Sequence, residues 1–119
     1  MNGDEAAAIA TALPGATYDQ PFGPNADVYK VGGRIFAIVG ASALPPTINL
    51  KCDPAHALEL RAVYSSITGG YHQDKRHWNT IVLDGSIPDD EVAEMIRQSH
   101  ALVVAGLSPV VRSQLNAPD

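Results

Sequence analysis

The chain has 119 residues, which is the size of one domain. Hydrophobic residues make up 45% of the sequence and charged residues 18%, a balance that can fill a core and that excludes disorder caused by excess charge. Eight basic and thirteen acidic residues give a net charge of −5, which argues against a protein whose whole surface binds polyanions.

Cysteine use and N-terminal charge indicate the cellular compartment. Cys52 is the only cysteine, so no disulfide can form within the chain, as is usual in a reducing compartment. Asp4 and Glu5 stand where a secretory signal peptide carries positive charge. The longest uncharged run, residues 35–50, is interrupted by one glycine and two prolines and is too polar for a membrane helix. We expect a cytoplasmic domain that does not enter a membrane.

The first part of the chain predicts one helix and a β-hairpin. Residues 4–13 predict a helix with an apolar stripe, in which Asp4 is the capping residue and the pair Pro14-Gly15 ends the helix. Residues 27–31 and 34–39 then read as two strands around Gly32-Gly33, a pair that adopts the positive φ angles of a tight turn. The second strand is apolar on both faces, which predicts a central position in the sheet. One face carries Ile35, Ala37 and Val39, and the other carries Phe36 and Ile38.

The middle of the chain predicts a strand, a helix and another strand. Residues 47–52 alternate between apolar and polar, which is typical of a half-buried strand. Asp53 is a suitable N-cap and Pro54 a suitable first helical residue. Residues 78–83 form the last clear strand. Between these elements, the helix is predicted to extend as far as Gly69-Gly70, because an apolar stripe continues through Ala57, Leu60, Tyr64 and Ile67.

The last part of the chain predicts a long helix and a short one. Pro88 and the acidic residues 89–91 favour a helix start, because negative charge is stabilised at the positive end of the helix dipole. Gly106 ends this helix, and Ser108-Pro109 begins a short terminal helix. Helical spacing predicts that the long helix buries Val92, Met95, Ile96, Ser99, Leu102 and Val103.

The order of these elements favours a single domain over residues 1–119. Hairpins are mixed with helices and do not alternate strictly with them. That order predicts an α+β fold of two layers, a mainly antiparallel sheet with helices packed on one side.

Residues 70–79 form the densest polar stretch of the chain. The segment from Lys51 to Trp78 carries four basic and three acidic residues, a net charge of +1, whereas the remainder carries four and ten, a net charge of −6. Tyr71 and Trp78 bracket the stretch. Cations that contact phosphates and aromatic rings that stack on bases are what a nucleic-acid site requires. The stretch therefore predicts a local anion or nucleic-acid site on an acidic protein.

Structural roles compete with this interpretation. Lys75 and Arg76 also fit a solvated turn, and Tyr71 and Trp78 also fit packing at a sheet edge. The two histidines of the stretch are suited to fixing the loop through hydrogen bonds.

Catalytic and metal-binding patterns are weak. His72, Asp74 and His77 are ligand types, but their spacing matches no standard zinc pattern. The acidic residues 89–91 are better explained as helix-start chemistry than as an iron site. No nucleophile motif surrounds Cys52 or the serines.

The order of short motifs along nearly the whole chain resembles the MmcQ/YjbR family. The central motif is Tyr71-His72-x-x-Lys75-Arg76-His77-Trp78-Asn79-Thr80. Further pieces follow the family's order: Pro21-Phe22-Gly23, residues 28–37, residues 50–54, Leu60-Arg61, Asp84-Gly85 and Ser99. The resemblance implies a compact α+β fold similar in shape to frataxin and to secretion-chaperone-like domains. The family is often labelled DNA-binding, and the resemblance implies no established catalytic activity.

The chain departs from the family pattern at several positions, and two of these changes lower its positive charge. Asp74 stands in the central motif where an uncharged residue is commoner, and the lysines usual after Leu107 are missing. His100 replaces the tyrosine that usually follows Ser99.

We interpret the sequence as a small non-enzymatic binding module without a cofactor or resident metal, and as a monomer. Its preferred ligand is nucleic acid, bound weakly and in a salt-dependent way. The first alternative is a protein-binding adaptor, and the third is a metal-handling or enzymatic role. The predicted site consists of Lys51, Arg61, Tyr71, His72, Lys75, Arg76, His77, Trp78 and Asn79.

Overall fold

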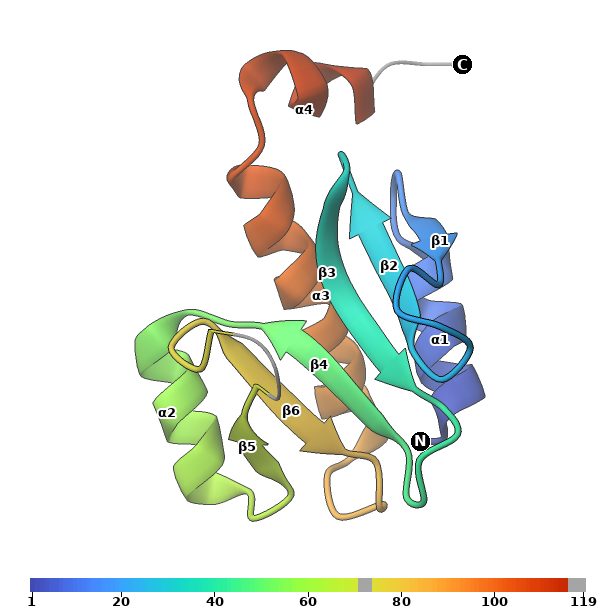
Figure 1. Cartoon of the computed structure of the whole chain (residues 1–119). Coiled ribbons are helices and arrows are strands. Elements are labelled where there is room, and N and C mark those ends of the chain that lie inside the picture. The colour runs from blue at the N-terminus through green and yellow to red at the C-terminus, as the bar shows by residue number, and fades with distance from the viewer. Residues whose placement is uncertain (71–73, 116–119) are drawn as a thin grey trace.

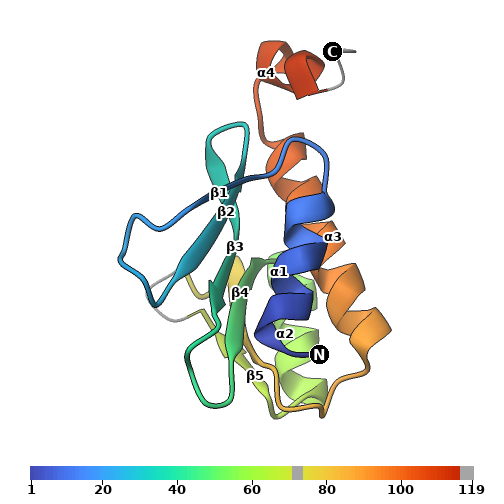
Figure 2. The same cartoon turned by 90° about the vertical axis from the view of Figure 1, so that its right-hand side faces the viewer.

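A computed structural model describes residues 1–70 and 74–115 of the chain. Its strands are β1 (Thr17–Asp19), β2 (Asp27–Val31), β3 (Arg34–Gly40), β4 (Thr47–Lys51), β5 (Ile67–Gly69) and β6 (Trp78–Val82). They form one sheet in the order β1-β2-β3-β4-β6-β5, and every described pair of neighbours is antiparallel (Figure 1). Helices α1 (Gly3–Ala12), α2 (Pro54–Val63) and α3 (Asp89–Ala105) cover the same face of this sheet (Figure 2). The predicted α+β fold is confirmed.

A β-bulge in β3 decides which residues face the helices. Tyr29 pairs with Ala37 and Lys30 pairs with Ile35, so Phe36 has no residue opposite it. Such an extra residue interrupts the alternation of a strand. Phe36 and Ala37 are both fully buried, whereas Ile35 is partly exposed. The strict alternation predicted for this strand is therefore wrong at the bulge.

Local chemistry explains where most helices begin. Asn2, and not Asp4, caps α1: its side chain accepts the Glu5 amide while the Glu5 carboxylate accepts the Asn2 amide, a capping box. The acidic first turn of α3 and its end at Gly106 are as predicted. The short terminal helix is present as α4 (Pro109–Leu115).

Two short edge strands were not predicted, and one of them shortens α2. The helix ends at Val63, and the chain then pairs with β6 as β5, with Ile67 opposite Ile81. The Val82 amide also donates to the Ser66 carbonyl at 2.9 Å. The backbone of residues 67–69 therefore forms its hydrogen bonds with β6, although apolar spacing alone predicted that these residues continue the helix. The other edge strand, β1, pairs with β2 over three residues.

The core lies between the sheet and the helices. Ile96 of α3 is fully buried against it, as predicted, together with Val92, Ser99 and Val103. Met95 is only partly buried, and Leu102 is 38% exposed, although both were predicted to be core residues. Among the described residues, no helix is long and apolar enough to span a membrane.

Candidate functional site

Helix α2 and the segment before it position the candidate site. The Asp53 side chain accepts the His56 amide, and Pro54 occupies the first helical position, where its missing N–H costs no hydrogen bond. The helix packs against β5 and β6, whereas α3 packs against β2, β3 and β4. The two helices therefore leave a space between them over β4 and β6.

Arg61 ties α2 to the turn that precedes β6. Its Nε donates to Oδ1 of Asn79 at 2.7 Å, and its Nη2 donates to the carbonyls of Lys75 and Trp78. Asn79 is 2% exposed, and its amide donates in turn to the Ala57 carbonyl at 3.4 Å. Arg61 and Asn79, both predicted as ligand contacts, thus also hold the helix and the strand together.

Asp74 organises the turn of residues 74–77. Its Oδ1 accepts the Arg76 amide at 2.9 Å, and its Oδ2 lies 2.6 Å from Nδ1 of His77. The contact with His77, followed by the Arg76 amide, holds the pKa of the Asp74 carboxyl below its usual value. The Cys52 amide donates to the His77 carbonyl at 2.7 Å and joins this turn to the end of β4.

The first depression, which we call the basic hollow, lies on the side of α2 that faces this turn. It has a volume of about 320 Å³ and is lined by Pro54, Ala55, Leu58, Arg61, Lys75 and Arg76. Lys75 and Arg76 are exposed, and within residues 1–70 and 74–115 no carboxylate forms an ion pair with either. The basic hollow therefore combines two available cations with an apolar wall.

The predicted site residues are only partly brought together. Three of them line the basic hollow, and His77 and Asn79 support it from behind. Lys51 lies opposite Trp78 in the pairing of β4 with β6, but it lines a different depression. Tyr71 and His72 lie outside the described residues.

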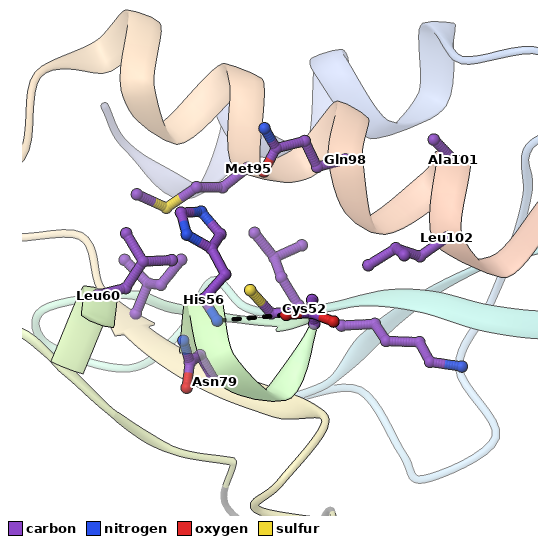
Figure 3. A pocket seen from close by; sticks show the side chains of 12 residues that line it. Cys52, His56, Leu60, Asn79, Met95, Gln98, Ala101 and Leu102 are labelled. Atoms are coloured by element: carbon purple, nitrogen blue, oxygen red, sulfur yellow. Dashed lines mark hydrogen bonds between the residues drawn. The ribbon is translucent and has the colours of Figure 1, made fainter. Parts of the chain in front are cut away.

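The second depression, which we call the cavity, lies between α2 and α3 and has a volume of about 420 Å³. Small-molecule sites in proteins occupy about 300–1,000 Å³. In Figure 3, Leu60 approaches the cavity from α2, and Met95 and Leu102 approach it from α3. Its apolar lining consists of Leu50, Leu60, Ile81, Met95, Ala101 and Leu102.

Polar side chains gather on one part of the cavity lining. His56 points from α2 toward Met95 and Gln98 of α3 (Figure 3). Cys52 is half-buried in the wall, where burial raises the pKa of its thiol and the neighbouring Asp53 carboxylate raises it further. A thiol with a raised pKa stays protonated at neutral pH and is a poor nucleophile.

Ser99 fixes the end of β4 beside the cavity. Its hydroxyl donates to the Phe36 carbonyl at 2.6 Å and accepts the Lys51 amide at 2.8 Å. The ladder between β3 and β4 ends at the pair Ala37 and Leu50, so the hydroxyl bridges the next residues of the two strands. Ser99 has no exposed surface. It therefore positions the backbone from which Lys51 and Cys52 project.

The cavity was not predicted from the sequence, although a signal was present. The apolar stripe of α3 contains two adjacent pairs, Met95-Ile96 and Leu102-Val103. A stripe that wide covers more than one packing surface. In the structure, Ile96 and Val103 face the core, whereas Met95 and Leu102 line the cavity.

No metal-binding cluster is present in the part of the chain that the structure describes, where no group of three His, Cys, Asp or Glu side chains gathers. Asp74 and His77 contact each other, and His72 lies outside the described residues.

Comparisons with known proteins identify relatives over most of the chain. The YjbR family model matches residues 11–102. The chain is 39% identical over 100 residues to the uncharacterized protein YbdF of Escherichia coli O157:H7, covering 84% of this chain and 82% of that protein. It is 33% identical over 93 residues to the uncharacterized protein YjbR of Escherichia coli K12, covering 78% of this chain and 79% of that protein.

Solved structures show the same architecture. The crystal structure of Deinococcus radiodurans protein DR2400 matches with a TM-score of 0.90 at 34% identity, covering 99% of this chain and 90% of that chain. A protein from Pseudomonas syringae shares the fold with a TM-score of 0.73 at 24% identity, covering 86% of this chain and 98% of that chain. The sequence motifs and these comparisons agree, and the chain belongs to the YjbR family.

Proposed function

We propose that this protein is a non-enzymatic binding module that holds nucleic acid at the basic hollow. The observation that carries the proposal is the pairing of Lys75 and Arg76, both exposed and in no ion pair among the described residues, with an apolar wall. Asp74 is the carboxylate whose charge interacts with Arg76. The cations suit phosphate oxygens, and the wall of Pro54 and Leu58 suits a sugar or base. We further propose that it acts in the cytoplasm, because its single cysteine has no disulfide partner within the chain, and that it acts there as a monomer.

The charge distribution limits how strongly such a site binds. The guanidinium of Arg61 already donates to Asn79, Lys75 and Trp78, so two cations remain for phosphates. Each phosphate contact on duplex DNA contributes a log–log salt slope of about −0.9, which gives a slope of about −2 for two contacts. The net charge of −5 also repels a polyanion. We expect affinity on the order of micromolar at low salt, fading near physiological salt.

Fluorescence anisotropy with labelled single- and double-stranded DNA across a salt series tests this proposal. The double variant Lys75→Glu/Arg76→Glu should abolish binding without lowering the melting temperature, because exposed charges contribute little to stability. Lys30→Glu/Arg34→Glu is the matched control, since it makes the same charge change on β2 and β3, away from the basic hollow. Its binding should fall far less.

A protein-binding adaptor is the second candidate, and one observation favours it. Leu58 and Val63 of α2 are 63% and 71% exposed. The nucleic-acid proposal is wrong if wild-type protein binds neither single- nor double-stranded DNA at low salt, or if both double variants lose binding equally. The protein-binding adaptor is then the better-supported function. Leu58→Glu, compared with wild type in a pull-down from lysate, would then identify partners that depend on this surface.

A further inference from the structure

The floor of the cavity offers no free polar group to a ligand. Leu50 and Ile81 form its floor together with Asn79. Both polar ends of the Asn79 side chain are already used, by Arg61 and by the Ala57 carbonyl. In the described part of the chain, no buried side-chain nitrogen or oxygen lacks a hydrogen-bond partner. Water needs polar partners to occupy such a space, so the interior favours an apolar occupant.

The polar part of the lining carries one ammonium group, that of Lys51, and one carboxylate, that of Asp53. Lys51 lines the cavity, and within residues 1–70 and 74–115 no carboxylate forms an ion pair with its ammonium group. The Asp53 carboxylate instead accepts the His56 amide at the start of α2, where the helix dipole offsets its charge. Gln98 adds a neutral amide donor from α3.

We propose that the cavity binds a small amphiphilic carboxylate, with its apolar body between α2 and α3 and its head group held by Lys51. A charge-assisted hydrogen bond from a lysine to a carboxylate is stronger than a neutral one and gives the site its selectivity. The cavity and the basic hollow have no lining residue in common. The proposal therefore does not depend on nucleic-acid binding.

Calorimetric titration with decanoate, decanol and decylammonium tests the head-group preference on the full chain. Decanoate should bind best and decylammonium worst. Lys51→Gln should weaken decanoate binding about tenfold and leave decanol binding unchanged, because one charge-assisted hydrogen bond is lost. The Lys51 amide that bonds Ser99 belongs to the backbone, so the fold should persist. Lys30→Gln makes the same charge change on β2 and should bind decanoate like wild type.

A filled cavity tests the location. Ala101 lines the cavity on an exposed position of α3, so Ala101→Phe should occupy the space and abolish decanoate binding while the protein stays folded. Ala8→Phe, on an exposed position of α1, is the matched control. Cys52 supplies an independent readout at alkaline pH, where its thiol ionises, because bound decanoate should slow its alkylation by iodoacetamide several-fold.

Three outcomes would overturn the proposal. The first is equal binding of decanoate and decanol by wild type. The second is unchanged decanoate binding in a folded Ala101→Phe protein. The third is binding that starts only at concentrations where decanoate forms micelles.

Discussion

The two depressions border the same ten-residue helix, yet they differ in how far they reach into the fold. On one side of α2, the basic hollow is lined by side chains of the helix and of the turn at residues 74–77, and Lys75 and Arg76 lie in solvent. On the other side, the cavity is lined mainly by apolar side chains and reaches down to the buried floor of the sheet. A short helix packed mainly on β5 and β6 leaves room beside α3, while the opposite side of the helix remains exposed.

Arg61 shows why a basic residue in a motif is not automatically a ligand contact. Lys75, Arg76 and Arg61 are equally basic in the sequence, but only the first two keep their side chains in solvent. The Arg61 guanidinium donates to three protein acceptors, so its main role is to hold the basic hollow in shape and not to bind a ligand.

Adjacent residues of α3 provide the largest expected contrast. Ile96→Ala should lower the free energy of unfolding by about 2–5 kcal/mol, because it opens a void in a fully packed core. Met95→Ala should lower it by about 1 kcal/mol, since that side chain packs against the core on one side and borders the cavity on the other. Chemical denaturation of both variants measures the difference. Equal losses would mean that the cavity is packed like the core.

Ser99→Ala should be the next largest effect. The variant leaves the Phe36 carbonyl and the Lys51 amide without their hydroxyl partner, at a cost of about 2–3 kcal/mol for the buried groups. Ser113→Ala removes an exposed hydroxyl from α4 and should change stability by less than about 0.5 kcal/mol. A Ser99→Ala protein as stable as wild type would show that the ladder does not need this bridge.

Arg61→Lys tests whether the basic hollow is built by the guanidinium or only by charge. Lysine keeps the charge but cannot reach Asn79, Lys75 and Trp78 together, so we expect a loss of about 1–2 kcal/mol in stability. DNA binding should also weaken, because the turn loses its anchor. Unchanged stability and binding would show that only the positive charge of Arg61 matters and that its three hydrogen bonds do not.

The smallest effect concerns pH and the turn at Asp74. The folded-state pKa of Asp74 lies below the ordinary value of 3.8, so its contribution is present above about pH 4 and is lost as the pH falls through the lower folded pKa. Asp74→Asn should speed hydrogen exchange at the Arg76 amide at neutral pH, while the melting temperature barely changes. Exchange as slow as in wild type would show that the carboxylate does not order the turn.

Much of the fold could be predicted because its signals are local. The Asp53-Pro54 start of α2, the glycine turn at 32–33 and the apolar stripe of α3 each lie within a few residues. The strand β5 could not be predicted, because Ile67 falls on the helical spacing of α2 and only its pairing with Ile81 decides otherwise. The bulge at Phe36 is likewise set by a neighbouring strand.

The candidate site was predictable only in part, for the same reason. Lys75 and Arg76 stand in one motif, so their proximity is local. The cavity depends on the distance between α2 and α3, which no short segment encodes. Lys51 and Gln98 meet at its lining only after the 46 residues between them have folded.

The central claim, that α2 separates a nucleic-acid site from a small-molecule site, can be tested with the only tryptophan and the only cysteine of the sequence. Trp78 directly follows the turn that carries Lys75 and Arg76, and Cys52 lines the cavity. Wild-type protein at low salt is titrated with an unlabelled oligonucleotide or with decanoate, while Trp78 emission and the rate of Cys52 alkylation are recorded. We predict that the oligonucleotide changes mainly the emission and that decanoate changes mainly the alkylation rate. If either ligand changed both signals equally, or if neither ligand changed any signal, the account would be contradicted.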